Sequence, residues 1–499
     1  MDSIIIKKRF FRNLLKGLLL LALPIWPCFN DLGNLPLRIW DEARQAQNAY
    51  EMYYNHQYWI PTFNGLPDVF GTKPSVFIVL EVISMKFFGI NEFALRFPAA
   101  ASAYLLGIAM MFFVWFYFKR FNTALISGIL LFGSQALIRN HVARTADYDA
   151  PVAAFGVMAA LSFFIFLHEN KKVFWYLTCL LFFLAVSMKG IAGLLLVPPL
   201  FLYAFSQKKL LQLLKSKHTF LGFAVFLFLT IAYYGVRNYY QPGYVALVYK
   251  AEICSLYFNT VQGHSEGFWF YAINFYSKWF SNYWWILPLG LASVFMTRNF
   301  MVRKVGIFSA FMMAGYFLII SNSATKLFWY DSQMYVFVIV ICATFFYWII
   351  EMMESSDYRK VYSMAMTFAI LLSLGLLGCI AVKDIIIDPQ ESANEKYFYT
   401  MANFLQQSNK ANRNLDGYKI LSGDLYVPHH TFYIQQLEKK GQRVEAVVFS
   451  QLIPGDSVMV SETNMNILIQ EKFNAVLLSN DYNIFAYRLD SLKNNDAAK

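Results

Sequence analysis

Long apolar segments separated by short polar loops constrain this chain more than any other feature. Hydrophobic residues occupy 58% of its 499 positions and charged residues only 15%, which is far too apolar for a soluble domain of this length. A helix that crosses about 30 Å of hydrocarbon needs about 20 apolar residues. The sequence therefore predicts an all-α polytopic membrane protein with about 11 transmembrane helices, over segments long enough to cross, or nearly so, at 14–28, 97–118, 123–138, 150–167, 173–188, 191–206, 220–236, 281–297, 305–320, 329–350 and 361–382.

The first segment has the basic flank of a signal peptide, but its end differs. Pro24, Trp26 and Pro27 stand where a cleavage site would have small residues, so we expect a retained anchor.

Basic residues fall in alternate loops, and this pattern predicts the orientation. By the positive-inside rule the basic loops, including the N-terminus, are cytoplasmic. The segment 74–90 would invert this pattern if it crossed, and it contains Glu81 and Lys86, so we expect a re-entrant or interfacial helix there. The C-terminus then lies outside the cytoplasmic (inner) membrane. The basic loops contain Lys7–Lys16, Lys119/Arg120, Lys171/Lys172, Lys208–Lys217, Arg298–Lys304 and Arg359/Lys360.

The composition changes after residue 382. Residues 1–382 are predicted to form the transmembrane domain, and residues 383–499 a small extracytoplasmic α/β domain. A helical pattern at 395–407 precedes short apolar runs bounded by Gly, Pro and Asn. These runs predict strands at 418–421, 444–449, 457–460, 475–478 and 484–488.

The charge and the cysteines exclude some classes of protein. The net charge of +11 resides mostly in the basic loops and would also suit anionic membrane lipids, and no nucleic-acid-binding module is visible. The five cysteines are scattered in or near apolar segments without a CxxC pair, so they indicate neither a disulfide framework nor a zinc site.

Several motifs on the predicted outer side resemble, in order, those of polyprenyl-phosphate-sugar transferases, the GT-C glycosyltransferases that include aminoarabinose lipid A transferases and protein O-mannosyltransferases. The resemblance covers roughly residues 1–340, and its specificity comes from the order and shared side of the motifs. The matching segments are Trp40-Asp41-Glu42-Ala43-Arg44, Gly71-Thr72-Lys73-Pro74-Ser75, Asn91–Pro98, Arg144-Thr145-Ala146-Asp147-Tyr148-Asp149, Lys189-Gly190, Phe268-Trp269-Phe270-Tyr271 and Ser323-Ala324-Thr325-Lys326-Leu327.

The resemblance implies a sugar donor linked to polyprenyl phosphate, and it places the aspartate of the second-loop motif at Asp149. The chain departs from the family pattern at three positions. Thr72 replaces the acid that precedes the Lys-Pro motif in the aminoarabinose branch, Ser75 replaces the second proline, and Phe328 replaces the late proline. The first departure puts a metal ligand in doubt.

The residue types alone also suit transfer from a lipid phosphate, which needs a carboxylate for the acceptor and cations for the departing phosphate. Asp41 is the candidate base, with Glu42 and Asp149 as further catalytic candidates; a carboxylate in the first turn of a helix is the structural alternative for Asp41. The candidate phosphate ligands are Lys73, Arg144, Lys189 and Lys326.

Each candidate cation has a structural alternative. Lys73 could be an interfacial lysine, Arg144 could pair with Asp147 or Asp149, and Lys326 could be an ordinary loop lysine. Lys189 lies between two apolar segments, where an ammonium usually has a functional or ion-pair partner, and Asp149 could be that partner.

The loop 237–280 interleaves basic and aromatic residues that could hold a sugar or a pyrophosphate, although aromatic belts at membrane interfaces are common. Its substrate-binding candidates are Arg237, Tyr240, His264, Trp269 and Tyr271. No metal site is predicted and no cofactor is required in this interpretation, although a divalent cation could be held by Asp41, Glu42, Asp149 and His264.

The sequence thus predicts a membrane glycosyltransferase that moves a sugar from a polyprenyl-phosphate donor to a lipid A, glycan or protein acceptor on the outer face of the membrane. The alternative is a lipid or polysaccharide transporter. That class would place ionisable residues near the bilayer midplane and show paired half-repeats. Here the charges concentrate at one face and no repeat is evident.

Overall fold

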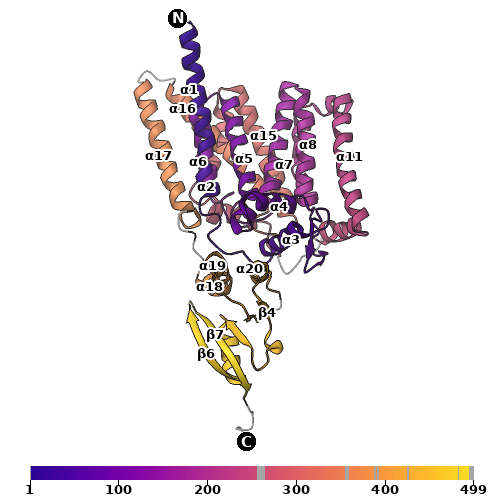
Figure 1. Ribbon diagram of the computed structural model, residues 1–499. Helices are drawn as coiled ribbons and strands as arrows, with labels where there is room; N and C mark the ends of the chain where they lie inside the picture. Colours follow the sequence, from indigo (N-terminus) through magenta and orange to yellow (C-terminus); the bar gives the residue numbers. More distant parts are fainter. Residues whose placement is uncertain are drawn as a thin grey trace.

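The long helices of the chain run side by side in one bundle (Figure 1). The computed structural model describes residues 2–255, 265–354, 359–386, 389, 393–423, 426–481 and 483–493. Within these ranges, 8 helices are long and apolar enough to cross a membrane: Phe10–Phe29, Glu92–Phe118, Asp149–Glu169, Lys172–Leu194, Lys217–Tyr240, Phe300–Ser321, Ser332–Glu354 and Tyr362–Ile386. Shorter apolar helices lie at Phe121–Phe132, Val197–Ser206 and Ile286–Met296.

Together these helices fall on the eleven expected segments, and the all-α polytopic fold class is confirmed. How many of them cross the membrane stays a prediction. The bundle contains α1 (Asp2–Ala22), α2 (Ile25–Phe29), α5 (Glu92–Phe118), α6 (Phe121–Phe132), α7 (Asp149–Glu169), α8 (Lys172–Lys189), η1 (Gly190–Leu194), α9 (Val197–Ser206), α10 (Leu210–Lys215), α11 (Lys217–Tyr240), α14 (Ile286–Met296), α15 (Phe300–Ser321), α16 (Ser332–Glu354) and α17 (Arg359–Ile386). Three short elements, α12 (Tyr244–Val248), η2 (Tyr249–Ser255) and α13 (Phe270–Asn274), are followed by η3 (Phe275–Trp279).

Small residues let the central helices approach closely. The buried residues of α7 include five alanines and Gly156, where an added Cβ would lie 2.8 Å from Gln333 Oε1 of α16. Small residues are typical of such interfaces in membranes, because helix association there depends on close packing. By contrast, α11 and α17 present most of their apolar side chains outward, as expected for helices at the lipid boundary.

One predicted segment is shorter than expected. The apolar run 123–138 predicts a long helix, but α6 ends at Phe132. At Gly133 an added Cβ would lie 2.9 Å from the Cα of Gly378 in α17, so the chain passes too close to its neighbour for a side chain. Residues 133–148 then form an irregular buried segment, and His141 has a positive φ of 61°. This segment carries several polar residues to the end of the bundle.

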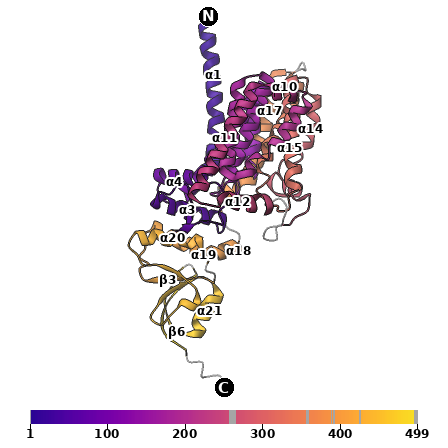
Figure 2. The same cartoon turned by 90° about the vertical axis from the view of Figure 1, so that its right-hand side faces the viewer.

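Two further helices lie at the end of the bundle opposite the N-terminus (Figures 1 and 2). They are α3 (Asp41–Asn55) and α4 (Val76–Phe88), joined through a hairpin of β1 (Thr62–Phe63) and β2 (Leu66–Pro67). The 13 residues of α4 are fewer than a span needs, as expected for a re-entrant or juxtamembrane helix.

The C-terminal part follows α17 and lies at the same end of the molecule as α3 and α4 (Figure 2). Its mixed sheet has the strand order β4-β3-β5-β7-β6, in which β3 is parallel to β4 and β5, while β7 is antiparallel to β5 and β6. The elements are α18 (Ala393–Phe398), α19 (Thr400–Lys410), β3 (Tyr418–Leu421), α20 (Pro428–Lys439), β4 (Glu445–Val447), η4 (Phe449–Gln451), β5 (Ser457–Val460), α21 (Thr463–Lys472), β6 (Phe473–Asp481) and β7 (Ile484–Leu492).

The C-terminal α/β part shares a hydrophobic core with the juxtamembrane helices. One buried cluster joins Ala46 and Tyr50 of α3 and Val82 of α4 to Phe432 and Leu437 of α20. The Tyr50 hydroxyl also donates to the Gln435 carbonyl at 2.9 Å. The helices of the C-terminal part are therefore packed directly onto the helix that begins at Asp41.

Candidate active site

The first turn of α3 contains two carboxylates with different surroundings. Glu42 is buried, and both of its oxygens are engaged. Oε1 accepts from Arg96 Nε at 2.7 Å and from the Ala146 amide at 2.9 Å, whereas Oε2 accepts from the Arg38 amide at 2.7 Å and from Arg96 Nη2 at 3.0 Å. Burial alone would raise the pKa of Glu42, but the Arg96 charge and these hydrogen bonds hold it below its ordinary value.

Glu42 therefore joins three chain segments rather than facing a substrate. Arg96 completes the network by donating to the carbonyls of Leu32, Leu35 and Pro36. This arrangement fits a positioning role for Glu42 better than the catalytic role predicted from the sequence.

Asp41, in contrast, is exposed. Its carboxylate lies with His141 and Asp147 in a group whose ligand atoms are all within 4.8 Å of one another. The pKa of Asp41 is raised because the surrounding protein desolvates the carboxyl, although water can reach it, and because Asp147 is also negative. The positive charges of His141, Lys189 and Lys73 act in the opposite direction. Asp41 thus lies near both an acidic group, Asp147, and three basic groups.

The loop before α7 supplies the other two members of this group. His141 Nδ1 lies 2.9 Å from Asp147 Oδ2, and its ring stacks on Trp329 with centroids 3.8 Å apart. Burial would lower the pKa of His141, but the hydrogen bond and the charge of Asp147 raise it above its ordinary value. Two carboxylates and an imidazole of this kind could hold a divalent cation. The candidate ligands differ from those predicted, since only Asp41 is common to both sets.

A pocket of about 50 Å³ is lined by Lys73 and Lys189, the two predicted phosphate-binding lysines whose charges act on Asp41. Lys189 pairs with the buried Asp149, which is the first residue of α7, and its ammonium lies 5.0 Å from the centre of the Tyr330 ring. Lys73 Nζ lies 2.9 Å from Glu252 Oε1. Asp149 is paired with Lys189, as expected from the sequence. Its carboxylate therefore balances a cation and does not face Asp41 directly.

Glu252 is a site residue that sequence reasoning missed. It lies in η2, is almost fully buried, and also accepts from the Thr72 hydroxyl at 3.0 Å. An added Cβ at Gly190 would lie 2.5 Å from Glu252 Oε2, so the Lys189-Gly190 turn leaves room for this carboxylate. Neither its sequence context nor its spacing marked it, because Glu252 is 179 residues from Lys73.

His141 and Asp147 were missed for a different reason. The segment Asp147-Tyr148-Asp149 offers two aspartates, and the sequence prediction selected Asp149. The structure brings Asp147 to Asp41 and Asp149 to Lys189. The two aspartates, separated by one residue, were the sequence feature that could have indicated both the Asp41 group and the Lys189 pair. Nothing in the sequence indicated His141.

Arg144 and Lys326 lie outside the residues that line the pocket. Arg144 points to the Cys28 carbonyl, 3.5 Å from its Nη1, and burial lowers its pKa to about 10. Lys326 donates to the Ser323 carbonyl at 2.8 Å. The structure therefore brings Lys73 and Lys189 together but does not add these two cations to them.

The predicted substrate-binding residues do not form one group. Arg237 is 0% exposed, and none of its guanidinium nitrogens has a hydrogen-bond partner among the described residues; Tyr244 covers it at 4.5 Å. Tyr240 is exposed and stacks with Trp59. Trp269 is exposed beside Phe317, whereas Tyr271 is buried. His264 lies outside the described residues.

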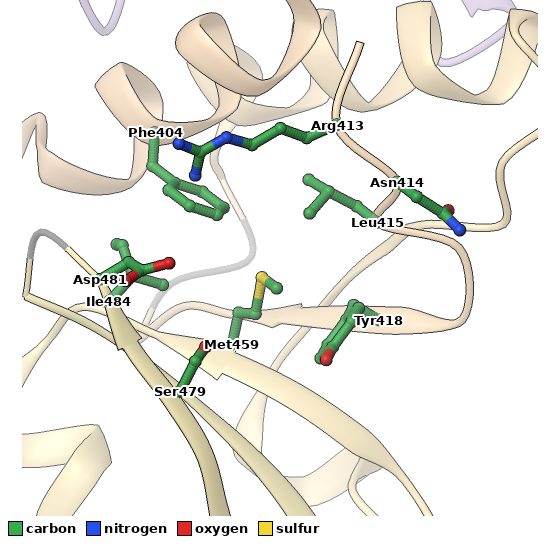
Figure 3. Close-up of a pocket in the computed structure, with 9 residues that line it drawn as sticks. All are labelled: Phe404, Arg413, Asn414, Leu415, Tyr418, Met459, Ser479, Asp481 and Ile484. Atoms are coloured by element: carbon green, nitrogen blue, oxygen red, sulfur yellow. The ribbon is translucent and has the colours of Figure 1, made fainter. Parts of the chain in front are cut away.

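A second hollow of about 330 Å³ lies in the C-terminal part (Figure 3). Arg413 lies above Phe404 on one side, and Asp481 and Ser479 lie below on the strands (Figure 3). Arg413, Ser479 and Asp481 are exposed, and neither the lysines nor Asp41 lines this hollow. We therefore assign the chemistry to Asp41, in the first turn of α3, and to the pocket that Lys73 and Lys189 line.

Comparison with known proteins also points to a glycosyltransferase. The model of the dolichyl-phosphate-mannose-protein mannosyltransferase family matches residues 72–234, which include Lys73, Asp147, Asp149 and Lys189. A protein of Aquifex aeolicus (strain VF5), described as uncharacterized, is 27% identical over 210 residues, which span 41% of this chain and 40% of that relative.

Solved structures resemble nearly the whole chain. ArnT from Cupriavidus metallidurans bound to undecaprenyl phosphate has a TM-score of 0.69 at 14% identity, covering 94% of this chain and 97% of that chain. Its apo state gives 0.65 at 14% identity, covering 96% and 98%. The oligosaccharyltransferase AglB from Archaeoglobus fulgidus, with an inhibitory peptide and a dolichol-phosphate, gives 0.53 at 10% identity, covering 97% and 74%. The chain therefore has the GT-C fold, and the predicted resemblance to these transferases is confirmed.

Proposed function

We propose that this protein is an integral membrane glycosyltransferase that moves a sugar from a polyprenyl-phosphate donor to a lipid A, glycan or protein acceptor. The observation that carries this proposal is the position of Asp41 in the first turn of α3, where it feels the charges of Lys73 and Lys189, which line one pocket. The family match and the bound undecaprenyl phosphate and dolichol-phosphate of the similar structures support the class of donor.

In this reaction the acceptor hydroxyl attacks the anomeric carbon of the sugar. The new bond joins the acceptor oxygen to that carbon, the bond from the carbon to the phosphate oxygen breaks, and polyprenyl phosphate leaves. Asp41 accepts the acceptor's proton, while Lys73 and Lys189 offset the charge that develops on the departing phosphate. The outward-facing apolar surfaces of the bundle offer a path for the polyprenyl tail.

The donor phosphate has to compete with a carboxylate that is already present. Lys73 and Lys189 each face one acid, Glu252 and Asp149, so the four charges balance. We therefore propose that the donor phosphate replaces Glu252 at Lys73, whereas Asp149 stays with Lys189.

The orientation follows from the basic loops and is part of the proposal. Reporter fusions after residues 170, 210 and 358 are expected to lie in the cytoplasm, and a fusion after residue 400 outside. A cytoplasmic signal from residue 400 would place Asp41 and the two lysines on the opposite face of the inner membrane and exclude transfer at the outer face.

Mass spectrometry of a deletion strain tests the function directly. Outer-membrane lipids and glycans of the deletion strain should lose a hexose or pentose mass, which wild-type protein restores and Asp41→Asn does not. If the protein were a transporter, its deletion would instead cause a lipid-linked precursor to accumulate. Asp41→Asn would then not abolish transfer while leaving donor binding intact. Unchanged lipids, glycans and glycoproteins in the deletion strain would overturn the proposal.

A further inference from the structure

The backbone just before Asp41 has a conformation that needs support. Trp40 has φ 71° and ψ −114°, in the positive-φ region that bulky residues rarely adopt. Such conformations persist only when the surrounding structure holds them, and they concentrate at functional sites. The Trp40 side chain is 57% exposed, so burial of the indole does not fix the turn.

The C-terminal part holds this turn through two tyrosine hydroxyls. The Leu37 amide donates to Tyr433 Oη at 3.0 Å, and the Ile39 amide donates to Tyr399 Oη at 3.1 Å. The Arg38 guanidinium lies 4.7 Å from the centre of the Tyr399 ring. Alternate residues of the segment before Asp41 are thus attached to a part of the chain that follows more than 350 residues later.

A third aromatic contact reaches the strained residue itself. The Trp40 ring stacks on Tyr426, with centroids 5.1 Å apart and planes at 26°. Together, Tyr399, Tyr426 and Tyr433 contact every residue from Leu37 to Trp40.

The two hydroxyls differ in what else depends on them. Tyr433 is buried and also donates to Glu92 Oε1 at 2.7 Å, so its loss would leave a buried carboxylate of α5 without that donor. Tyr399 lies at the start of α19, and its hydroxyl bonds only within the turn segment, to the Ile39 amide and to the Arg38 side chain, as far as the described residues show. Removing the Tyr399 hydroxyl is therefore the milder way to release the turn.

We propose that the C-terminal part positions the catalytic carboxylate, and that Tyr399 is a positioning residue for Asp41. The Tyr399 and Tyr433 hydroxyls hold the amides at positions 39 and 37, which maintains the Trp40 turn and directs Asp41 toward Lys73 and Lys189. This inference rests on the proposed glycosyl transfer for its catalytic consequence, but the attachment of the turn can be measured without any activity.

The test compares Tyr399→Phe with Tyr397→Phe in the full-length protein in nanodiscs. Tyr397 is a matched control, because its hydroxyl also accepts a backbone amide, that of Thr463 at 2.9 Å, but within the C-terminal part. Tyr399→Phe keeps the ring against Arg38. We expect hydrogen exchange in the peptide spanning residues 37–41 to accelerate at least tenfold in Tyr399→Phe and to stay unchanged in Tyr397→Phe.

The catalytic readout is a split between kcat and donor affinity. We expect kcat to fall about tenfold in Tyr399→Phe, while the dissociation constant for undecaprenyl phosphate and the melting temperature stay as in the wild type. Unchanged exchange at residues 37–41 would refute the attachment. Faster exchange with unchanged kcat would refute the positioning role, as would equal losses of kcat and melting temperature in both variants. A wild type that transfers no sugar would refute the proposed function, while exchange would still decide the attachment.

Discussion

Two groups of charges lie at one end of this molecule, and they differ in how many hydrogen-bond partners each charge has. Around Glu42 and Arg96, the carboxylate and guanidinium hydrogen bond to each other and to several backbone groups. Around Lys73 and Lys189, each ammonium faces one carboxylate in a pocket beside the exposed Asp41. The first group is a closed network, in which each charge has several hydrogen-bond partners. The second is an open group, in which we propose that the donor phosphate replaces the carboxylate at Lys73. We infer that the first group maintains the structure of the site, whereas the second group binds the substrate.

The largest effect is expected from breaking the closed network. Arg96→Leu leaves Glu42 buried without its cation, which should cost about 3–5 kcal/mol of stability. The melting temperature of the purified protein in detergent should therefore fall sharply. Arg443→Leu is the matched control, because Arg443 forms an exposed ion pair with Asp416 at 3.2 Å, and its loss should not change the melting temperature. Equal stability of Arg96→Leu and the wild type would contradict the structural assignment of this network.

The next effect concerns the open group. Lys73→Ala should weaken binding of undecaprenyl phosphate by about 1.5–3 kcal/mol if the lysine makes one charge-assisted hydrogen bond to phosphate, or roughly tenfold to a hundredfold in dissociation constant. Native mass spectrometry of the protein with added lipid provides the measurement. Lys326→Ala should bind normally, because Lys326 lies outside the pocket lining. If both variants bound equally well, Lys73 would not be a phosphate ligand.

A smaller effect of opposite sign is expected at Glu252. Glu252→Gln removes the carboxylate that occupies Lys73, so undecaprenyl phosphate should bind about threefold to tenfold more tightly. Glu445→Gln, an exposed position on β4, is the control. In a double-mutant cycle the gain should vanish in the Lys73→Ala background, because Glu252 acts through that lysine. Weaker binding in Glu252→Gln would instead make the acid a required part of the site.

The smallest effect is expected from removing metal. We propose that no divalent cation is required, because Lys73 and Lys189 offset the phosphate charge and Thr72 lacks the carboxylate of the aminoarabinose branch. Transfer should therefore persist after exhaustive chelation. Chelation is a strict test of this prediction, because Asp41, His141 and Asp147 together could hold a divalent cation. Activity lost with a chelator and restored by a divalent metal would contradict it and assign these three residues as ligands.

The sequence predicted the fold and part of the site. Hydropathy located the apolar helices because each span is a long continuous signal, and motif order singled out Asp41, Lys73 and Lys189. The end of α6 at Phe132 was not predictable, because it depends on the close approach of Gly133 to Gly378. Glu252 and His141 were missed because their roles arise from contacts between distant segments. The strands of the C-terminal part were predicted, but the attachment of Tyr399 to the Ile39 amide was not.

The central claim is that Asp41 acts on the acceptor while other groups bind the donor. Asp41→Asn keeps the shape of the side chain but cannot accept a proton at neutral pH, so it tests this claim most directly. With a polyprenyl-phosphate sugar that the wild type uses, we predict that turnover in Asp41→Asn falls by about 10²–10⁴-fold. Its dissociation constant for undecaprenyl phosphate and its melting temperature should stay as in the wild type. Near wild-type turnover in Asp41→Asn would contradict the account and remove Asp41 as the base.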